Sequence, residues 1–405
     1  MMKKERAFTF LLAVNSCLFL SSCYFMNPNY NWGNYHPSSN QGNKDKVDFK
    51  EPTYDSSFQK GNMTKDSLGA GFGYHYLPST GNSKILVVPV EVSGDFFEKR
   101  YGSDWETPLK NVFFGDSTNT GWESVSSFYE KSSYSKLHLT GEISPVIKLN
   151  KTASELKALN TKYSNNNQNY TDEILKNVCN TLAENNAVDF SEYDTDGDGY
   201  LDAVWLVYST PYDQSSDLFW AYTTWANLTG EVDGVTPCCY AWASYEFLME
   251  QDYRPLGTTS YKNSADAHTF IHETGHMMGL DDYYSYDYEY SSTNPRGNAD
   301  TPVGGNDMMD FNIGDHDSFS KYVLGWLNPV VITKEMLAIN NTLTLQSFQD
   351  SGKAFLIPIY KDGSMDYNQT PFDEYLIVEY YTPTNLNAQD VSGYGLSKQR
   401  MYSQK

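Results

Sequence analysis

Cysteine and basic residues are both scarce in this chain of 405 residues. Five cysteines are too few for a disulfide scaffold, although one bridge from Cys179 to Cys238 or Cys239 is compatible with the sequence. Lys and Arg number 29 against 51 Asp and Glu, which gives a net charge of −22. A nucleic-acid partner needs a basic face that displaces counterions from phosphate, so this composition argues against one.

The chain also lacks a long apolar run at its N-terminus. Residues 7–20 are apolar but interrupted by Asn15, whereas a spanning helix needs roughly 18 or more such residues. Basic residues precede the run, and small residues followed by Cys23 end it. This pattern is similar to a bacterial lipoprotein signal, which implies cleavage before Cys23 and a lipid on its thiol. An ordinary signal peptide with an incidental cysteine is the alternative.

The segment after this predicted signal peptide (residues 1–22) is polar. Residues 23–66 consist largely of Asn, Tyr, Ser, Gly and Lys with little apolar periodicity. Such a composition is typical of a flexible tether that holds a folded body away from a membrane. A pro-segment is the alternative, and composition does not separate the two. We therefore expect an extracellular, cell-surface protein attached to the membrane through Cys23 alone.

Apolar periodicity predicts an α+β fold. Branched apolar runs predict buried strands at residues 85–90 and 203–208, and 3.6-residue spacing predicts helices near 125–129 and over 174–182. After Pro329 the pattern becomes alternating, with strands expected at residues 343–345, 355–359 and 375–379. We therefore predict a main domain at residues 67–330 and a β-rich C-terminal region at residues 331–405.

A helix expected over residues 264–278, with Ser264 as N-cap, carries the motif that points to chemistry. His272 and His276 lie four residues apart, on one helical face, so both imidazoles can bind one ion. Zn²⁺ accepts neutral imidazole and keeps one position open in catalytic sites. Glu273 follows the first of the two histidines and can take a proton from water at the ion. Because this short pattern also occurs by chance, the residues after it matter.

Those residues extend the motif to HExxHxxGxxD. Gly279 allows the chain to leave the helix in a left-handed turn. Asp282 then stands where the metzincin pattern carries its third ligand, and a carboxylate suits zinc. Asp281 is the competing candidate because it is adjacent. Further on, Met309 is our candidate for a Met-turn beneath the metal, although Met308 and Met309 are also compatible with simple core packing.

A second motif has oxygen donors at alternating positions and predicts a structural Ca²⁺ site. Its candidate ligands are Asp194, Asp196, Asp198, Tyr200 and Asp202. Closely spaced carboxylates repel one another unless a cation offsets their charge. Trp205 stands where an EF-hand carries its bidentate Glu, so a full EF-hand is not expected. A solvated acidic turn is the alternative.

Several separated stretches together resemble the immune inhibitor A-like family of secreted bacterial zinc metallopeptidases. They include KILVVPVEVSGDFF, DTDGDGYLDAVWLVY, FIHETGHMMGLDDYY, GGNDMMDFN and FSKYVLGWLNP, all between residues 84 and 329. The resemblance implies a metzincin-like fold, with a mixed sheet and an active-site helix, and endopeptidase activity. It also implies zinc bound by His272, His276 and Asp282, Glu273 as general base, and calcium elsewhere.

The chain departs from the family at two places. A Trp-Ser-His stretch common before the active-site helix is replaced by one without His, at residues 219–222. Met309 is followed by Asp310 and Phe311, so no Tyr stands two residues on to polarise a carbonyl. We expect an exported zinc endopeptidase acting on proteins or peptides. The alternative is a catalytically inactive, calcium-stabilised surface-binding or adhesion lipoprotein.

Overall fold

The structure is a computed structural model. It describes residues 48–49, 64–118, 120, 122–165, 169–212, 217–249, 265–284, 303, 306–310, 314–339 and 342–388. The predicted signal peptide and its lipidation site Cys23 lie outside these residues. Among the helices that the structure describes, none is both long and apolar enough to cross a membrane.

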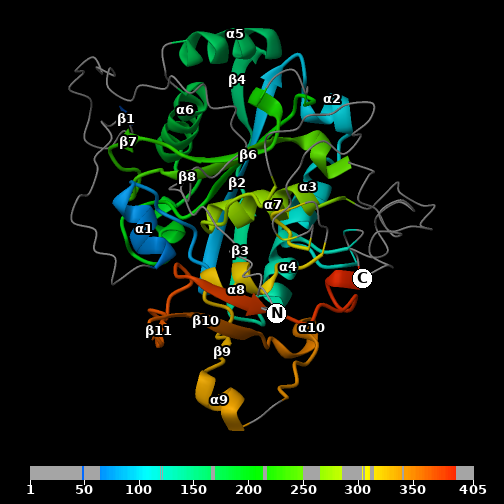
Figure 1. Ribbon diagram of the computed structural model, residues 1–405. Coiled ribbons are helices and arrows are strands. Elements are labelled where there is room, and N and C mark those ends of the chain that lie inside the picture. The colour runs from blue at the N-terminus through cyan, green and yellow to red at the C-terminus, as the bar shows by residue number, and fades with distance from the viewer. Residues whose placement is uncertain are drawn as a thin grey trace, which may run out of the picture.

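A mixed six-stranded sheet forms the centre of the molecule (Figure 1). Its strand order is β3-β2-β5-β8-β6, with β4 beside β3 on the same edge of β2, and only β6 runs antiparallel to its neighbour. The strands are β2 (Gly81–Ser93), β3 (Leu137–Ile143), β4 (Ile147–Thr152), β5 (Val204–Tyr208), β6 (Tyr222–Trp225) and β8 (Cys239–Ser244). Both faces of β5 are buried, which explains its unbroken apolar sequence.

Helices cover both faces of this sheet, and each face has its own core. The core on one face includes Leu109, Phe128 and Phe270 from α3, α4 and α7. The opposite core includes Ile174 and Val178 from α6. The helices are α1 (Lys65–Gly71), α2 (Phe97–Tyr101), α3 (Glu106–Phe114), α4 (Val125–Ser132), α5 (Ala153–Ser164), α6 (Tyr170–Glu184), α7 (His268–Met277), α8 (Ser318–Val323), α9 (Lys334–Ile339) and α10 (Phe348–Ser351). Short 3₁₀ helices are η2 (Phe190–Tyr193), η3 (Asp217–Phe219) and η4 (Tyr245–Met249).

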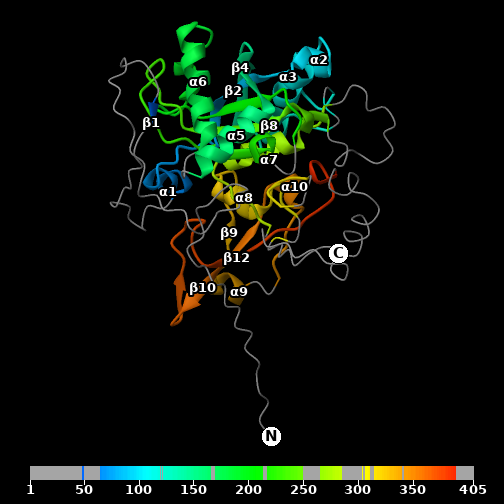
Figure 2. The same ribbon diagram turned by 90° about the horizontal axis from the view of Figure 1, so that it is seen from above.

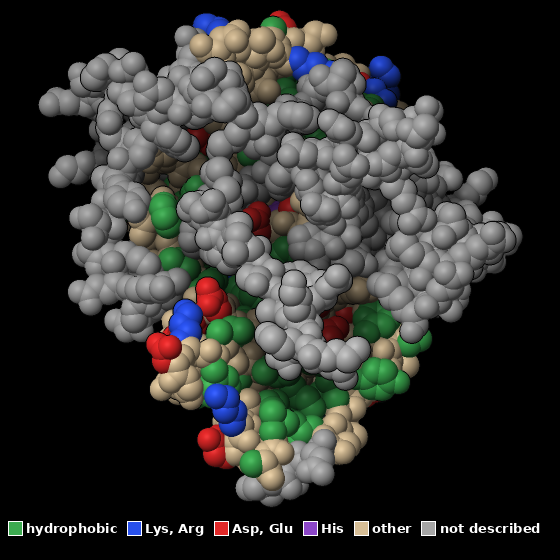
Figure 3. Space-filling model, in the orientation of Figure 1, with side chains coloured by type: hydrophobic (Ala, Val, Ile, Leu, Met, Phe, Trp, Pro, Cys, Tyr) green, Lys and Arg blue, Asp and Glu red, His purple; other side chains and the backbone are tan. Residues whose placement is uncertain are grey.

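A second, smaller sheet lies beyond α8, away from the main sheet (Figure 2). Its strands are β9 (Val330–Val331), β10 (Phe355–Lys361), β11 (Ser364–Asp366) and β12 (Tyr375–Val378). One face packs on a small core with Leu327, Phe348 and Ala354. The other face exposes apolar side chains, Ile357 opposite Leu376 among them (Figure 3). The outward residues of β10 and β12 therefore alternate with buried ones.

The mixture of helices with a mixed sheet agrees with the predicted α+β class. The runs predicted as strands at residues 85–90 and 203–208 lie in β2 and β5, and the helix predicted over 174–182 lies in α6. The strand expected at residues 343–345 is not formed. Leu343 and Leu345 are indeed more buried than their neighbours, but no described strand pairs with them. Alternation alone therefore marks an extended segment, not its partner.

Two parts of the predicted tether belong to the described structure. Strand β1 (Asp48–Phe49) pairs antiparallel with β7 (Leu228–Thr229). Helix α1 begins at Lys65 and is preceded by a capping box between Thr64 and Ser67. These contacts place ordered elements on the N-terminal side of residue 67.

The cysteines that the structure describes are all free. Cys179, Cys238 and Cys239 are buried. Cys179 belongs to the α6 core and Cys239 to the core on the opposite face of the sheet. Neither disulfide considered from the sequence is formed, and the intervening sheet separates Cys179 from Cys239.

Candidate metal centre

Helix α7 presents the two motif histidines to Asp282. The Nε2 atoms of His272 and His276 lie 3.0 and 3.3 Å from Asp282 Oδ1. For comparison, two ligands on neighbouring corners of a tetrahedral zinc ion lie roughly 3.3 Å apart, given Zn–N bonds of about 2.0–2.1 Å. The side chains of His276 and Asp282 are fully buried, and that of His272 is 12 % exposed. Three zinc-type donors therefore converge at nearly the spacing of a bound ion.

Backbone carbonyls fix the orientation of both imidazoles. His272 Nδ1 lies 2.9 Å from the Met308 carbonyl oxygen, and His276 Nδ1 lies 2.8 Å from that of Leu280. A carbonyl only accepts hydrogen bonds, so each Nδ1 carries a proton, and each Nε2 is the nitrogen that can bind an ion once it is deprotonated. The His276 Nε2 atom is buried and makes no hydrogen bond within the described residues. This donor set fits zinc, since outer partners of this kind orient ligating histidines in metal sites.

The turn after α7 brings Asp282 back to the helix. Gly279 has φ +93°, and Gly279 N–H and Leu280 N–H donate to the carbonyls of His276 and Gly275. These two bonds form a Schellman motif, the common way for a helix to end at glycine. The helix begins at His268, later than expected, because Ala265 bridges to Thr120. Ser264, the expected N-cap, lies outside the described residues.

Asp282, and not its neighbour Asp281, meets the histidines. The Asp281 side chain instead accepts a hydrogen bond from the Asp282 backbone N–H at 3.0 Å. Burial raises the pKa of Asp281 to about 6. Burial also opposes ionisation of Asp282, but the adjacent His276 and His272 hold its pKa well below the usual value. In the structure Asp282 is thus the carboxylate suited to a ligand role.

Charge pairing dominates the cluster of His272, His276 and Asp282. Burial disfavours the charged form of His276, yet Asp282 outweighs this and raises the His276 pKa to about 10. The same two opposed effects leave the pKa of His272 raised. A cation entering the cluster must displace the shared proton, because a zinc ligand is neutral imidazole.

Glu273 is buried beside the histidine–aspartate cluster, and it accepts hydrogen bonds from Thr223 of β6. The hydroxyl oxygen of Thr223 lies 2.9 Å from both the backbone oxygen and Oε2 of Glu273. Burial raises the pKa of Glu273, whereas His276 and His272 oppose that rise. A carboxylate with a raised pKa can both take and return a proton near neutral pH. Nothing in the sequence indicates Thr223, which lies 50 residues before its partner.

Met309 packs directly under α7. A Cβ placed on Gly275 would lie only 2.6 Å from Met309 Sδ, so a larger residue there would force the Met309 side chain to shift. The Met308 carbonyl of the same turn accepts the bond from His272. The position expected for a Met-turn and the candidate ligand His272 are thus physically linked through neighbouring residues.

The turn that carries Met308 and Met309 is held by a buried carboxylate, Asp307, that belongs to neither predicted motif. Asp307 accepts hydrogen bonds from Met309 N–H at 2.7 Å, from Asp317 N–H at 2.6 Å and from the Ser320 hydroxyl at 2.7 Å. Despite its burial the pKa of Asp307 is lowered, above all by His316. Because it accepts several hydrogen bonds, Asp307 braces this turn. Its partners lie up to 13 residues away in the sequence, so no local sequence pattern indicates this role.

The two tyrosines that directly follow Asp282 occupy different positions. Tyr283 is partly buried, and its hydroxyl oxygen accepts a hydrogen bond from the Ser320 hydroxyl at 3.1 Å. The ring of Tyr284 lies near His272, with centroids 6.5 Å apart and planes at 21°. Tyr283 therefore packs behind the methionine turn, and Tyr284 lies on the histidine side.

The acidic loop forms a second, separate cluster. Carboxylate oxygens of Asp194, Asp196 and Asp202 lie within 4.8 Å of one another. Asp198 instead lies 2.6 Å from His75 Nδ1, and the Tyr200 ring stacks on His75 at 3.4 Å. Three of the five predicted calcium ligands are thus brought together, and the other two contact His75.

This loop is largely satisfied by its own atoms. Asp194 accepts hydrogen bonds from the N–H groups of Asp198 and Gly199 at 3.0 and 3.1 Å. Asp202 accepts one from Thr195 N–H at 2.9 Å. Burial raises the pKa of Asp202 to about 7. The neighbouring carboxylates of Asp194, Asp196 and Asp202 fit a hard cation, which would offset the repulsion between their negative charges.

A short segment joins the acidic loop to the end of α7. His75 contacts the loop, and its carbonyl accepts a bond from Trp225 of β6 at 3.1 Å. Two residues later, Leu77 N–H donates to the Met277 carbonyl at 2.9 Å. Between them, the Tyr76 ring lies against Gly279. Residues 75–77 therefore contact both the acidic loop and the C-terminal end of α7.

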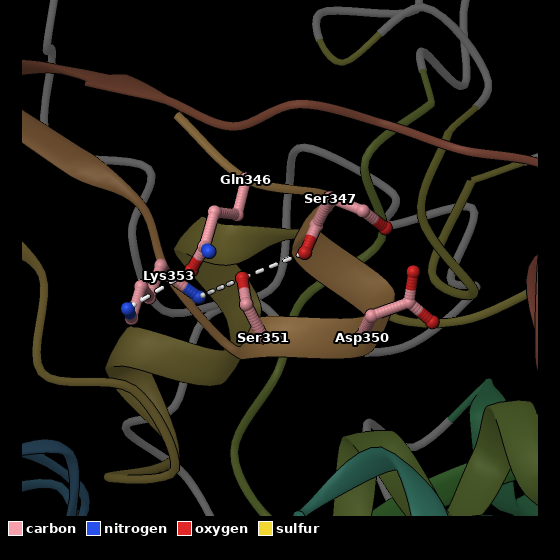
Figure 4. Close-up of a pocket in the computed structure, with 5 residues that line it drawn as sticks. All are labelled: Gln346, Ser347, Asp350, Ser351 and Lys353. Carbon is pink, nitrogen blue, oxygen red and sulfur yellow. Dashed lines mark hydrogen bonds between the residues drawn. The ribbon is translucent and has the colours of Figure 1, made fainter. Parts of the chain in front are cut away.

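A polar pocket of about 550 Å³ opens at α10, in the C-terminal region (Figure 4). It is lined by Gln346, Ser347, Asp350, Ser351 and Lys353. These residues bond to one another: Lys353 Nζ donates to Gln346, and the Ser351 hydroxyl donates to the Ser347 carbonyl. The pocket includes no member of either ligand cluster.

No family model matches the chain, and no curated protein matches its sequence. The residues of the two clusters therefore carry the functional assignment.

Proposed function

We propose that this protein is a zinc-dependent endopeptidase of the immune inhibitor A-like type. The observation that carries the proposal is the convergence of His272, His276 and Asp282 on one buried point, with Glu273 beside it. Two nitrogen ligands, one carboxylate and an adjacent base are the donor set of a hydrolytic zinc site.

Each residue has a defined task in peptide hydrolysis. Zinc, when bound, supplies a Lewis acid that activates water and polarises the scissile carbonyl. Glu273 takes the proton released by water and returns it to the departing amine nitrogen. The Met308 carbonyl holds the His272 ring, and Leu280 holds that of His276. Burial keeps bulk water from competing for these hydrogen bonds.

Fold features support a metzincin-like catalytic domain with a β-rich C-terminal region. An antiparallel edge strand, β6, lies next to the helix that carries the histidines. A methionine turn packs beneath that helix, at Gly275. The second sheet follows as a separate element of residues 330–378. A mixed sheet beside an active-site helix is what the family resemblance implies, and the second sheet agrees with the alternating apolar pattern after Pro329.

The proposal includes a structural calcium ion and a place outside the cell. Asp194, Asp196 and Asp202 would hold calcium through their gathered carboxylates. A lipid on Cys23 would anchor the protein at the bacterial cell surface, where it would act on proteins or peptides. The acidic composition supports this site-based assignment by disfavouring nucleic acid as partner.

Hydrolysis of denatured casein tests the proposal. The protein should begin at Tyr24, so that β1 and α1 are retained, and should be supplied with zinc and calcium. Glu273→Gln keeps the size of the side chain and removes its basicity, and Glu98→Gln changes an exposed glutamate as control. We expect hydrolysis by the native protein and the control, and loss of activity with full zinc content in Glu273→Gln. Equal zinc in all three with no hydrolysis would instead favour the surface-binding alternative.

A further inference from the structure

Thr223 faces the active-site helix from the edge strand of the main sheet. It is fully buried, whereas its neighbours Tyr222 and Thr224 on β6 are partly exposed. Antiparallel pairing with Ala241 of β8 fixes its backbone. Successive side chains of a strand point to opposite sides, so this register turns the Thr223 hydroxyl toward α7. There it reaches two oxygens of a single residue, the backbone O and Oε2 of Glu273, both at 2.9 Å.

A hydroxyl at equal distance from two acceptors can serve both protonation states of Glu273. It has one proton to donate and can also accept. When Glu273 is ionised, the hydroxyl can donate to Oε2, a charge-assisted bond stronger than a bond to a neutral carbonyl. When Glu273 is protonated, the hydroxyl can turn to the backbone oxygen without moving its own oxygen. The carboxyl group thus keeps a neighbour in the same place before and after proton transfer.

We propose that Thr223 is a positioning residue for the general base. It holds the Oε2 side of the Glu273 carboxyl group and leaves the other oxygen to exchange protons with water and the leaving amine. This inference rests on the proposed function, because it assigns Thr223 a role through Glu273. It differs from a purely structural role, in which the hydroxyl would only satisfy the buried backbone oxygen.

Kinetics of three variants test the proposal. Thr223→Val keeps the shape and removes the hydroxyl, Thr223→Ser restores it, and Thr224→Val is a matched change on the same strand. In Thr223→Val we expect kcat to fall about tenfold or more, as for a lost bond to a charged group, with KM and zinc content unchanged. Thr223→Ser should recover most of kcat, and Thr224→Val should match the native protein. Equal kcat in Thr223→Val and the native protein would overturn the inference.

A double variant separates positioning from structure. In the Glu273→Gln background the base is gone, so adding Thr223→Val should cause no further loss of residual activity. A further loss of similar size would show that the hydroxyl acts independently of the base, and would overturn the proposal.

Crystal structures keep the inference testable if the native protein does not hydrolyse any substrate. That result would end the proposed function alone. In zinc-loaded crystals, the Glu273 carboxylate should leave its native position in Thr223→Val and keep it in Thr223→Ser. An unmoved carboxylate in Thr223→Val contradicts the positioning role.

Discussion

The two ligand clusters of this protein are held in opposite ways. In the candidate metal centre, His272 is fixed by a carbonyl 36 residues away, and the buried Nε2 atom of His276 faces the Asp282 carboxylate. In the acidic loop, Asp194 accepts from N–H groups four and five residues further along. The first cluster depends on a segment distant in sequence as well as on α7, whereas the second is held by its own backbone.

This difference indicates how far each cluster depends on an ion. The loop gives its carboxylates protein donors, so it can keep its shape without calcium despite charge repulsion. The metal centre places two imidazoles and a carboxylate together under burial, an arrangement that needs a proton or a cation between them. We therefore expect changes at the metal centre to have the larger effects.

Removing a zinc ligand should have the largest effect. His276→Ala takes away a fully buried donor, and even outer partners of ligating histidines are worth about 10- to 100-fold in metal affinity. We expect zinc affinity to fall by at least about a hundredfold and peptidase activity to disappear. Competition with a chromogenic chelator measures the affinity. His138→Ala, at an exposed histidine on β3, is the control, and equal affinity of the two variants would refute the ligand assignment.

The brace beneath the metal centre should show the next effect. Asp307 accepts bonds from Met309 N–H, Asp317 N–H and the Ser320 hydroxyl, so the amide of Asp307→Asn would bring a donor against donors. We expect a loss of about 2–4 kcal/mol in the free energy of unfolding, measured with urea. Asp362→Asn, in the exposed turn between β10 and β11, should stay within about 0.5 kcal/mol of native. A similarly small change in the free energy of unfolding of Asp307→Asn would contradict the bracing role of Asp307.

Asp172 is a buried carboxylate with no histidine among the causes of its pKa shift, so it shows what burial does to the pH dependence of stability. Burial raises the pKa of Asp172 to about 7, against partial opposition from the Tyr240 hydroxyl and the Asn227 backbone. The native state then binds more protons than the unfolded state between pH 4 and 7. Its stability should therefore fall as pH rises through this window.

Asp172→Asn should remove this part of the pH dependence. Between pH 5 and pH 8 the native protein should lose about 1–3 kcal/mol relative to the variant, measured by urea unfolding at both values. A constant difference between the two proteins would show that Asp172 titrates normally. Glu173→Gln, on the same helix turn, is the matched control.

The acidic loop should give the smallest effect. Asp196 is exposed, and the hydrogen bond that it accepts from Asp198 N–H is rather long, at 3.2 Å. Asp196→Asn therefore removes little besides a negative charge from the acidic loop. In EDTA the variant should unfold within about 2 °C of native. Calcium should raise the native Tm by stabilising the folded state and raise that of the variant less. A native Tm that calcium leaves unchanged would contradict the calcium proposal.

The parts predicted well from the sequence depend on local spacing. Helical spacing of His272 and His276, and the glycine turn at Gly279, are properties of consecutive residues. The buried strands at β2 and β5 likewise follow from short apolar runs. The position within the motif predicts Asp282, and not Asp281, as the third candidate ligand, and the structure brings Asp282 to the two histidines.

The parts that escaped prediction depend on contacts distant in sequence. Thr223 meets Glu273 across 50 residues, and the Tyr129 hydroxyl reaches the Ile271 carbonyl at 2.7 Å across 142. Neither of these two contacts produces a periodic pattern in the sequence. The expected strand at residues 343–345 failed for a related reason, since alternation does not supply a neighbouring strand. Pairing and bracing are set by the tertiary fold.

The free cysteines offer a built-in reporter of conformational opening. Cys179 and Cys239 lie in cores on opposite faces of the main sheet, out of reach of a thiol reagent in the folded state. Burial also raises the pKa of both thiols, so their reactive thiolate forms are rare. The rate at which each is alkylated under native conditions would therefore measure how often its own side of the sheet opens, without any introduced label.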